Sequence, residues 1–205
     1  WDIRASIAHA RMLGAQGIVS KADSKKIISG LGAIAKEIEA GRFAFDPSLE
    51  DVHTNIETAL VKSVGDAGKR LHTARSRNDQ IATDVRLWAR DQIDTIDRLL
   101  AHLQEAFLSI AEANVETILP GCTHLQHAQP VSLGHHMLAY FEMFHRDRIR
   151  FIELRTRVNI MPLGSAALAG TPHPIDRFAV AEELGFDAVC GNSMDAVSDR
   201  DYLIE

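Results

Sequence analysis

Two short polar segments carry most of the side chains that could do chemistry. The first is Gly121–Pro130, in which Thr123, His124 and Gln126 stand close together. We expect this segment to lie between two long helices, where a hydroxyl and an imidazole beside a helix start can receive an anionic ligand. The same residues also fit an ordinary helix–helix turn that Thr123 caps, with histidines at the surface.

The second polar segment is His72–Asp79, at the expected start of the first long helix. Ser76 and Asp79 have the spacing of a capping box, which by itself requires no function. Arg77 and Asn78 add a forked cation and an amide, both of which suit carboxylates. Together, the two segments predict a cradle for a di- or tricarboxylate.

Helices must position these segments, because apolar residues recur three and four positions apart and no stretch alternates as a strand does. We predict an all-α fold. One long helix is expected from Asp79 to about Ala113, and a second has Pro130 in its first turn and ends near Val158. The apolar seam of the first helix is formed by Ile93, Ile96, Leu100, Leu103, Phe107 and Ile110.

Gly65–Gly68 interrupts the helical pattern and marks the predicted domain boundary. We expect a small N-terminal helical domain over residues 1–70 and a central helical-bundle domain over residues 71–205. A short helix in the first domain should be capped by Thr54 and Glu57 and end near Val64. His53 would then project from its start, either into a site or as a surface residue. Helices as long as those of the second domain usually belong to a bundle shared between subunits, so we expect an oligomer.

Composition excludes several classes of function. The 205 residues are 46% hydrophobic and 24% charged, and no apolar run approaches the roughly 20 residues of a membrane span. A net charge of -6 argues against nucleic acid as a partner. Two cysteines favour a reducing cytoplasm. The chain starts at Trp1 and stops at Glu205 inside an apparent helix, so we expect it to be part of a longer protein.

Motifs for metals and cofactors are missing. The histidines lack zinc spacing and show no Glu-x-x-His pairing of the di-iron bundle type, so no metal site is expected. There is no glycine-rich phosphate or dinucleotide loop, and no cofactor is expected.

Several motifs together resemble argininosuccinate lyase, a family of the fumarase/aspartase superfamily that includes the lens relative delta crystallin. Ser-Arg-Asn-Asp-Gln after His-Thr-x-Arg is the most specific of them. The similarity runs in order through essentially the whole chain, at residues 51–55, 71–80, 121–130, 161–165 and 192–196.

This resemblance implies a homotetramer with a long helical bundle and active sites assembled from three subunits. The implied reaction is the reversible elimination of arginine from argininosuccinate with release of fumarate, a step of arginine biosynthesis. Carried over residue by residue, His124 is the catalytic residue on the acid side, and the substrate-binding residues are Ser76, Arg77, Asn78, Thr123, Gln126 and His53.

One departure from the family pattern concerns the catalytic base. The family's Gly-Ser-Ser-x-Met-Pro-x-Lys-x-Asn loop carries the serine thought to abstract the proton, and that motif is absent from these residues. The 205 residues alone are therefore predicted to be inactive. Alternatives are a non-catalytic protein like delta crystallin and another fumarate-releasing lyase, such as adenylosuccinate lyase or fumarase.

Overall fold

Helices dominate the computed structural model, which describes residues 1–205. The α-helices are α1 Asp2–Ala15, α2 Lys21–Glu39, α3 Val52–Val64, α4 Arg77–Ala113, α5 Leu133–Val158, α6 Arg177–Leu184 and α7 Ser193–Ser198. Short 3₁₀ helices cover Gly65–Arg70 and Asp201–Leu203. None of the helices combines the length and apolar character that crossing a bilayer would require. The all-α class is confirmed, and α4 and α5 end where the sequence predicted.

Four short strands were missed by the sequence prediction. β1 Ile118–Thr123 and β2 Gln126–Ser132 form an antiparallel hairpin, and β3 Ile160–Met161 pairs in parallel with β4 Ala188–Val189. The last two strands have two residues each. Such short pairs are too brief to show an alternating pattern in sequence.

The chain divides into two compact units. Unit 1 consists of residues 1–88 and 159–205, and unit 2 of residues 89–158. Helix α4 contributes to both units, since the division falls after Trp88. This division reflects compactness alone. The predicted domains, residues 1–70 and 71–205, stay a prediction.

Unit 1 holds two buried apolar clusters. One joins residues of α1 to the region around α6 and includes Leu13, Met161 and Leu184. The other lies among α1, α2 and α3 and includes Ile27 and Leu60, which are fully buried. The amphipathic helices of this unit therefore bury their apolar faces within the unit itself.

Aspartate caps fix two of the helix starts in unit 1. Asp51 caps α3, because its Oδ1 accepts a hydrogen bond from Thr54 N at 2.6 Å. Asp176 caps α6 in the same way, and the left-handed Gly185 ends it. The predicted Thr54–Glu57 capping box is wrong, since the helix starts before Thr54 and Glu57 binds other partners. The predicted end of α3 at Val64 is confirmed.

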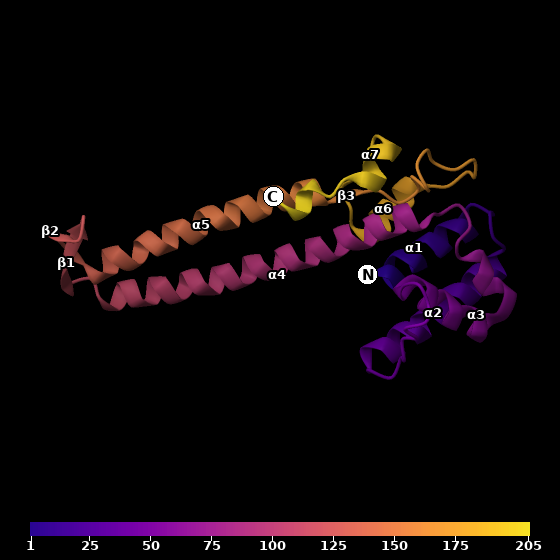
Figure 1. Ribbon diagram of the computed structural model, residues 1–205, viewed down its shortest axis with the longest axis horizontal. Helices are drawn as coiled ribbons and strands as arrows, with labels where there is room; N and C mark the ends of the chain where they lie inside the picture. Colours follow the sequence, from indigo (N-terminus) through magenta and orange to yellow (C-terminus); the bar gives the residue numbers. More distant parts are fainter. The chain divides into compact units, whose positions relative to one another are not determined.

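Unit 2 contains the helical pair and the β1–β2 hairpin that joins it (Figure 1). Phe107 of α4 stacks against Tyr140 and Phe144 of α5. Arg148 donates to both oxygens of Asp97, at 2.7 and 3.1 Å. These contacts hold α4 and α5 against each other along one side.

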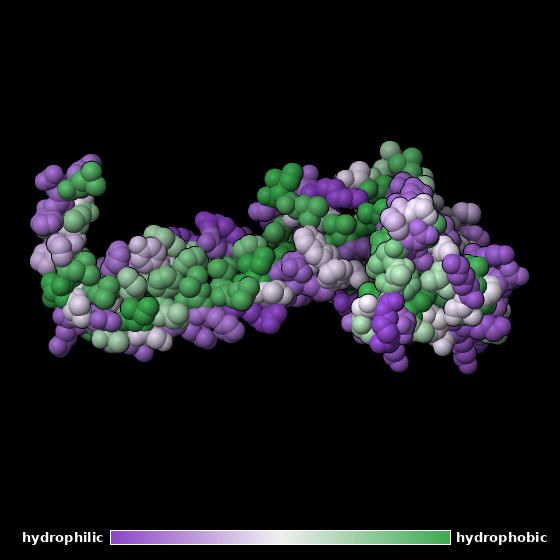
Figure 2. All heavy atoms as spheres, turned by 60° about the horizontal axis from the view of Figure 1, so that its bottom comes forward, coloured by the Kyte–Doolittle hydropathy of each residue, from purple (hydrophilic) through white to green (hydrophobic).

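Unlike unit 1, unit 2 has many exposed apolar side chains. Figure 2 shows hydrophobic atoms running along the surface of the long helices. These residues are more than a third exposed: Leu99, Leu103, Leu108, Ile110, Val115, Ile118, Leu138, Met143, Ile149 and Ile152. Two helices alone cannot bury apolar side chains on every side.

Candidate active site

The turn at residues 72–79 is fixed by the carboxylate of Asp79, which is fully buried. Its Oδ1 accepts a hydrogen bond from Ser76 N at 2.9 Å, which is one half of the predicted capping box. The hydroxyl oxygen of Ser76 accepts from Asn78 N at 3.3 Å. Ser76 and Asn78 thus sit in a turn whose backbone is held by their own neighbours.

The same carboxylate also binds the irregular crossing that follows β3. Asp79 Oδ2 accepts from Gly164 N at 2.9 Å and Ala166 N at 2.8 Å. Both of these residues have positive φ, +91° for Gly164 and +51° for Ala166, so the buried acceptor stabilises a backbone form that side chains disfavour. Asn78 Nδ2 donates to Ala167 O at 2.8 Å. Asp79 and Asn78 therefore join two of the predicted motif segments directly.

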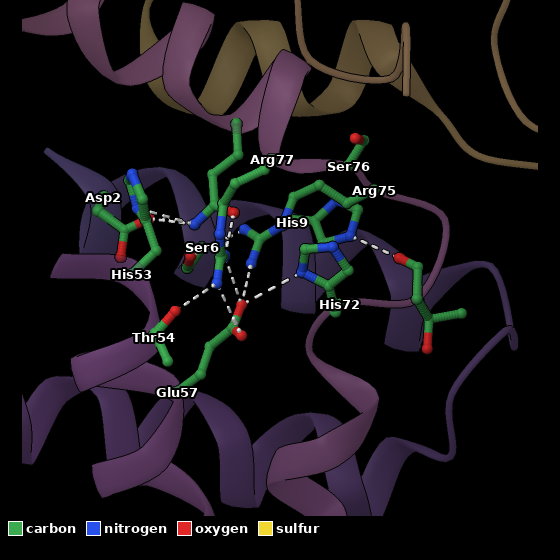
Figure 3. Close-up of polar contacts among 12 residues, drawn as sticks. Asp2, Ser6, His9, His53, Thr54, Glu57, His72, Arg75, Ser76 and Arg77 are labelled. Carbon is green, nitrogen blue, oxygen red and sulfur yellow. Dashed lines mark hydrogen bonds and ion pairs between the residues drawn. The ribbon is translucent and has the colours of Figure 1, made fainter. Parts of the chain in front are cut away.

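Arg77 points away from the exposed side of this turn and toward α3 (Figure 3). Its Nη1 donates to Glu57 Oε1 at 2.9 Å, and its Nη2 to Glu57 Oε2 at 3.2 Å. Glu57 Oε1 also lies 3.2 Å from Nδ1 of His72. Burial opposes ionisation of Glu57, but the hydrogen bonds from His72 and Arg77 outweigh it and lower the pKa of this carboxyl to about 2. Glu57 is therefore a carboxylate at any pH near neutrality.

His53 lies with two carboxyl groups at the start of α3. Its Nδ1 is 3.1 Å from Asp2 Oδ1 and 3.7 Å from Asp84 Oδ2. Gln80 Nε2 lies 3.2 Å from His53 Nδ1, and Gln80 Oε1 accepts from Arg77 Nη1 at 2.8 Å, so the side chain of Gln80 links His53 to the turn. Asp2, His53 and Asp84 line a cavity of about 820 Å³, and the other walls of this cavity are largely apolar.

The two acids of this group ionise differently. Burial and the neighbouring Asp2 raise the pKa of Asp84, so this carboxyl tends to keep its proton. Burial also works against ionisation of Asp2, but hydrogen bonds from His53 and Gln80 and the charge of Arg75 lower its pKa. A pair of close carboxyl groups thus holds one negative charge more readily than two.

A divalent cation is a poor fit for this group. Ligand atoms of Asp2, His53 and Asp84 lie within 4.8 Å of one another. However, the completely buried guanidinium of Arg75 interacts with both acids, and it already supplies the positive charge that a metal would bring. We therefore assign no metal to these residues.

Two further buried groups surround the turn. Arg75 Nη1 donates to Ser6 Oγ at 2.8 Å. His9 Nε2 is 2.9 Å from Thr73 O, and burial together with the charge of Arg75 lowers the pKa of His9 to about 3. His9 is therefore neutral and donates a hydrogen bond to the turn.

The hairpin of unit 2 carries the other polar segment. Thr123 pairs with Gln126, and His124 and Leu125 form the two-residue tip with φ of +52° and +62°. Two positive φ values are typical of a type I′ hairpin turn, which usually contains glycine or asparagine. Leu125 is 99% exposed, and Thr123, His124 and Gln126 are exposed as well. The tip presents its polar side chains to the outside.

Gly121–Pro130 lies between α4 and α5, as predicted. It forms a hairpin, so the alternative of a turn capped by Thr123 is wrong, and so is the place of Pro130 in the first turn of a helix, since Pro130 lies in β2. Pro120 and Pro130 face each other across the two strands. A bulge follows Pro120, and a Cβ on Gly121 would come within 2.7 Å of Gln129 O. Two prolines and a glycine suggested a break in a helix, whereas a two-stranded hairpin tolerates them at its edges.

The sequence-predicted site residues fall into two groups. Ser76, Arg77 and Asn78 share one turn of unit 1, and the side chain of Gln80 connects this turn to His53. Thr123, His124 and Gln126 share the hairpin of unit 2. The sequence missed the following residues around the first group: Asp2, Glu57 and Asp84. Glu57 was assigned to a cap, and the two aspartates had no motif to mark them.

Comparisons with known proteins agree with the motifs. A family model described as Lyase matches residues 1–205. This chain belongs to that lyase family. Curated relatives named argininosuccinate lyase include those of Methylibium petroleiphilum, 61% identical over 204 residues, and Cupriavidus necator, 62% identical over 205 residues. The matches cover 100% of this chain but only 44% and 43% of these relatives, so the chain spans less than half their length.

Solved structures of lyases share the fold. EDDS lyase in complex with formate has a TM-score of 0.85 and 32% identity, covering 98% of this chain and 39% of that chain. A fumarate lyase from Mesorhizobium sp. BNC1 has a TM-score of 0.79 over 98% of this chain and 48% of its own, and at 23% identity it supports the fold alone. The resemblance to the fumarase/aspartase superfamily predicted from the motifs is confirmed.

Proposed function

We propose that this chain is part of an argininosuccinate lyase. That enzyme eliminates arginine from argininosuccinate and releases fumarate. The observation that carries the proposal is about 60% identity to curated argininosuccinate lyases along the whole chain. Arginine biosynthesis is the corresponding pathway.

The turn of unit 1 supports this proposal because it offers neutral donors to a carboxylate. The hydroxyl of Ser76 uses its oxygen to accept a bond from Asn78 N, which leaves its proton available. Asn78 is exposed and uses one amide proton on Ala167 O, which leaves the other. Removing the proton beside the succinyl carboxylate builds negative charge on it, and donors that are already fixed stabilise that charge without reorganising.

We assign the acid-side chemistry to the hairpin of unit 2. His124 would supply a proton to the departing guanidino group, directly or through a neighbour, since an imidazole is the side chain that most often acts as a general acid. Thr123 and Gln126 flank it and would bind the substrate. Because the tip is exposed in one chain, the proposal requires a neighbouring subunit to cover it and exclude water.

A homotetramer is part of the same proposal. The exposed apolar side chains along α4 and α5 are the kind of surface that a shared helical bundle buries. We also propose a cytoplasmic location, which suits the free thiols of Cys122 and Cys190.

The direct test is to express the product of the complete reading frame that encodes these residues, add argininosuccinate and follow fumarate by absorbance. We expect fumarate release, and we expect His124→Asn to lower kcat by about 100-fold or more, as loss of a general acid does. Adenylosuccinate, malate and EDDS serve as competing substrates. The 205 residues alone should release no fumarate, because the motif with the catalytic serine is not among them.

Each alternative has its own outcome in this assay. A correctly assembled tetramer that turns over none of the substrates would favour the non-catalytic, crystallin-like reading. Turnover of only one of the other substrates would instead assign the protein the activity of a different lyase of the superfamily. Equal rates of fumarate release for the wild type and His124→Asn would show that His124 is not a catalytic residue.

A further inference from the structure

The guanidinium of Arg77 is bound by several groups of this chain. A guanidinium has five N–H bonds. Nη1 donates to Glu57 at 2.9 Å and Gln80 at 2.8 Å, and Nη2 donates to Glu57 at 3.2 Å and Thr54 at 3.3 Å. Nε lies 3.2 Å from Oδ2 of Asp51. Both terminal nitrogens, which a substrate carboxylate would need for a fork, are thus already bound within the chain.

Glu57 is the centre of this arrangement. Its carboxylate receives Arg77 through both oxygens, and Oε1 also lies 3.2 Å from His72 Nδ1 and 3.6 Å from Arg75 Nη2. All three basic residues come from the segment that carries Ser76 and Asn78, whereas Glu57 belongs to α3. One carboxylate therefore attaches the whole basic segment to another helix (Figure 3).

Geometry makes this pair rigid. The two parallel Arg77–Glu57 bonds form a fork that fixes the plane of the guanidinium. Both side chains are about three-quarters buried, at 27% and 26% exposed. A substrate that took Arg77 would have to leave a largely buried carboxylate without its partner, which is costly.

We propose that Glu57 and Arg77 are positioning residues, which hold the turn so that Ser76 and Asn78 meet the substrate carboxylate. The motif resemblance had assigned Arg77 to the substrate itself. This inference rests on the proposed lyase function. It deepens that proposal by assigning two roles. Ser76 and Asn78 contact the substrate, and Arg77 with Glu57 holds Ser76 and Asn78 in place.

The two roles for Arg77 predict opposite effects of Glu57→Gln on KM. If Arg77 positions the turn, the loss of the ionic fork misplaces Ser76 and Asn78, and KM for argininosuccinate rises by about tenfold or more. If Arg77 binds the substrate, removing the competing anion frees it and KM falls. A merely structural role would reduce the active fraction, which lowers apparent kcat and leaves KM unchanged.

A matched control is available on α2. Glu37 makes a similar bidentate pair with Arg42, at 2.8 and 3.0 Å, away from the turn and more exposed. We expect Glu37→Gln to leave both kinetic constants unchanged. Arg77→Lys should raise KM as Glu57→Gln does, because an ammonium cannot form the fork. The double variant should be little worse than either single variant, since both break the same unit. A fall in KM in Glu57→Gln, or additive effects of the two substitutions, would overturn the proposal.

A crystal structure of the complete protein, with and without fumarate, separates this inference from the proposed function. We expect Arg77 to stay paired with Glu57 in both forms and Asn78 to meet the ligand. Arg77 turned from Glu57 toward fumarate, or unpaired from Glu57 without any ligand, would refute the inference. The ligand-free form decides the pairing even if the wild-type protein releases no fumarate, which would be the failure of the proposed function alone.

Discussion

The two units of this chain solve the problem of apolar surface in different ways. Unit 1 surrounds two buried clusters with helices, whereas unit 2 leaves many apolar side chains of α4 and α5 exposed. The candidate site is divided in the same way. The turn of unit 1 is fixed by buried hydrogen bonds, and the hairpin tip of unit 2 is exposed. The comparison teaches that unit 1 buries its apolar side chains within itself, while unit 2 leaves an apolar surface for the proposed neighbouring subunits to cover.

The sharpest way to test this contrast is to truncate one leucine in each unit. Leu13 is fully buried in unit 1, and Leu13→Ala should cost about 3 to 5 kcal/mol of unfolding free energy. Leu99 is 62% exposed in unit 2. Leu99→Ala should cost less than about 0.5 kcal/mol in the isolated 205 residues, because no cavity forms. Urea unfolding measures both, and equal losses would contradict the contrast.

A charge among the exposed apolar side chains of α4 tests the proposed dependence of unit 2 on partners. In the product of the complete reading frame, Leu99→Glu should weaken subunit association by about 100-fold, because it would bury an unpaired carboxylate. Phe178 of unit 1 is 73% exposed, and Phe178→Glu is the control that should leave assembly intact. Light scattering over a dilution series reports the mass. An unchanged mass for Leu99→Glu would show that the surface around Leu99 is not an interface.

The acids of the two units should respond to pH with opposite signs. The raised pKa of Asp84 means that the folded protein holds a proton that the unfolded chain releases, so its contribution to stability is full at low pH and lost as pH rises. Asp84→Asn keeps a donor toward Asp2 and should stabilise unit 1 by about 1 to 3 kcal/mol at pH 8, and by less at pH 4.

Asp97 of unit 2 supplies the comparison. The hydrogen bond from Arg148 lowers the pKa of Asp97, so its contribution is present near neutral pH and is lost as pH falls. Asp97→Asn should therefore destabilise near pH 7 and have no effect at low pH. Thermal unfolding across this range measures both variants, and a gain that is independent of pH for Asp84→Asn would contradict the assigned ionisation.

The smallest expected effect concerns the hairpin tip. Leu125 has a positive φ and is almost fully exposed, so Leu125→Gly removes strain and little packing. We expect the hairpin to gain about 0.5 to 1 kcal/mol, measured by amide hydrogen exchange in β1 and β2. Leu119→Gly, in the body of β1, should weaken the hairpin. Faster exchange in Leu125→Gly would show that the tip is not strained.

The long helices could be predicted because their signal is local and repeated. Apolar residues spaced by three and four gave the end of α4 at Ala113 and the end of α5 at Val158. The hairpin could not be predicted in the same way. Its prolines and glycine have the same local meaning in a helix break and in a short two-stranded ladder, and only the pairing of β1 with β2 decides between them.

The candidate site shows the same limit. Ser76, Arg77 and Asn78 were found from their motif, but Glu57 was taken for a capping residue because the Thr-x-x-Glu spacing is local. Its true partner, Arg77, lies 20 residues further along the chain. Asp2 and Asp84 come together only through the packing of α1, α3 and α4. Spacing along the chain carries no record of such contacts.

The buried carboxylate of Asp79 has a consequence for how the protein is made. It holds the site turn to Gly164 and Ala166, which follow it by 85 and 87 residues. At about 5 to 20 residues per second, a ribosome needs roughly 4 to 17 seconds to add that stretch. Until then Asp79 lacks two of its three backbone partners, so the turn reaches its final form only after Ala166 has been added. A nascent chain that stalls before Ala166 would expose an incomplete turn to chaperones and proteases.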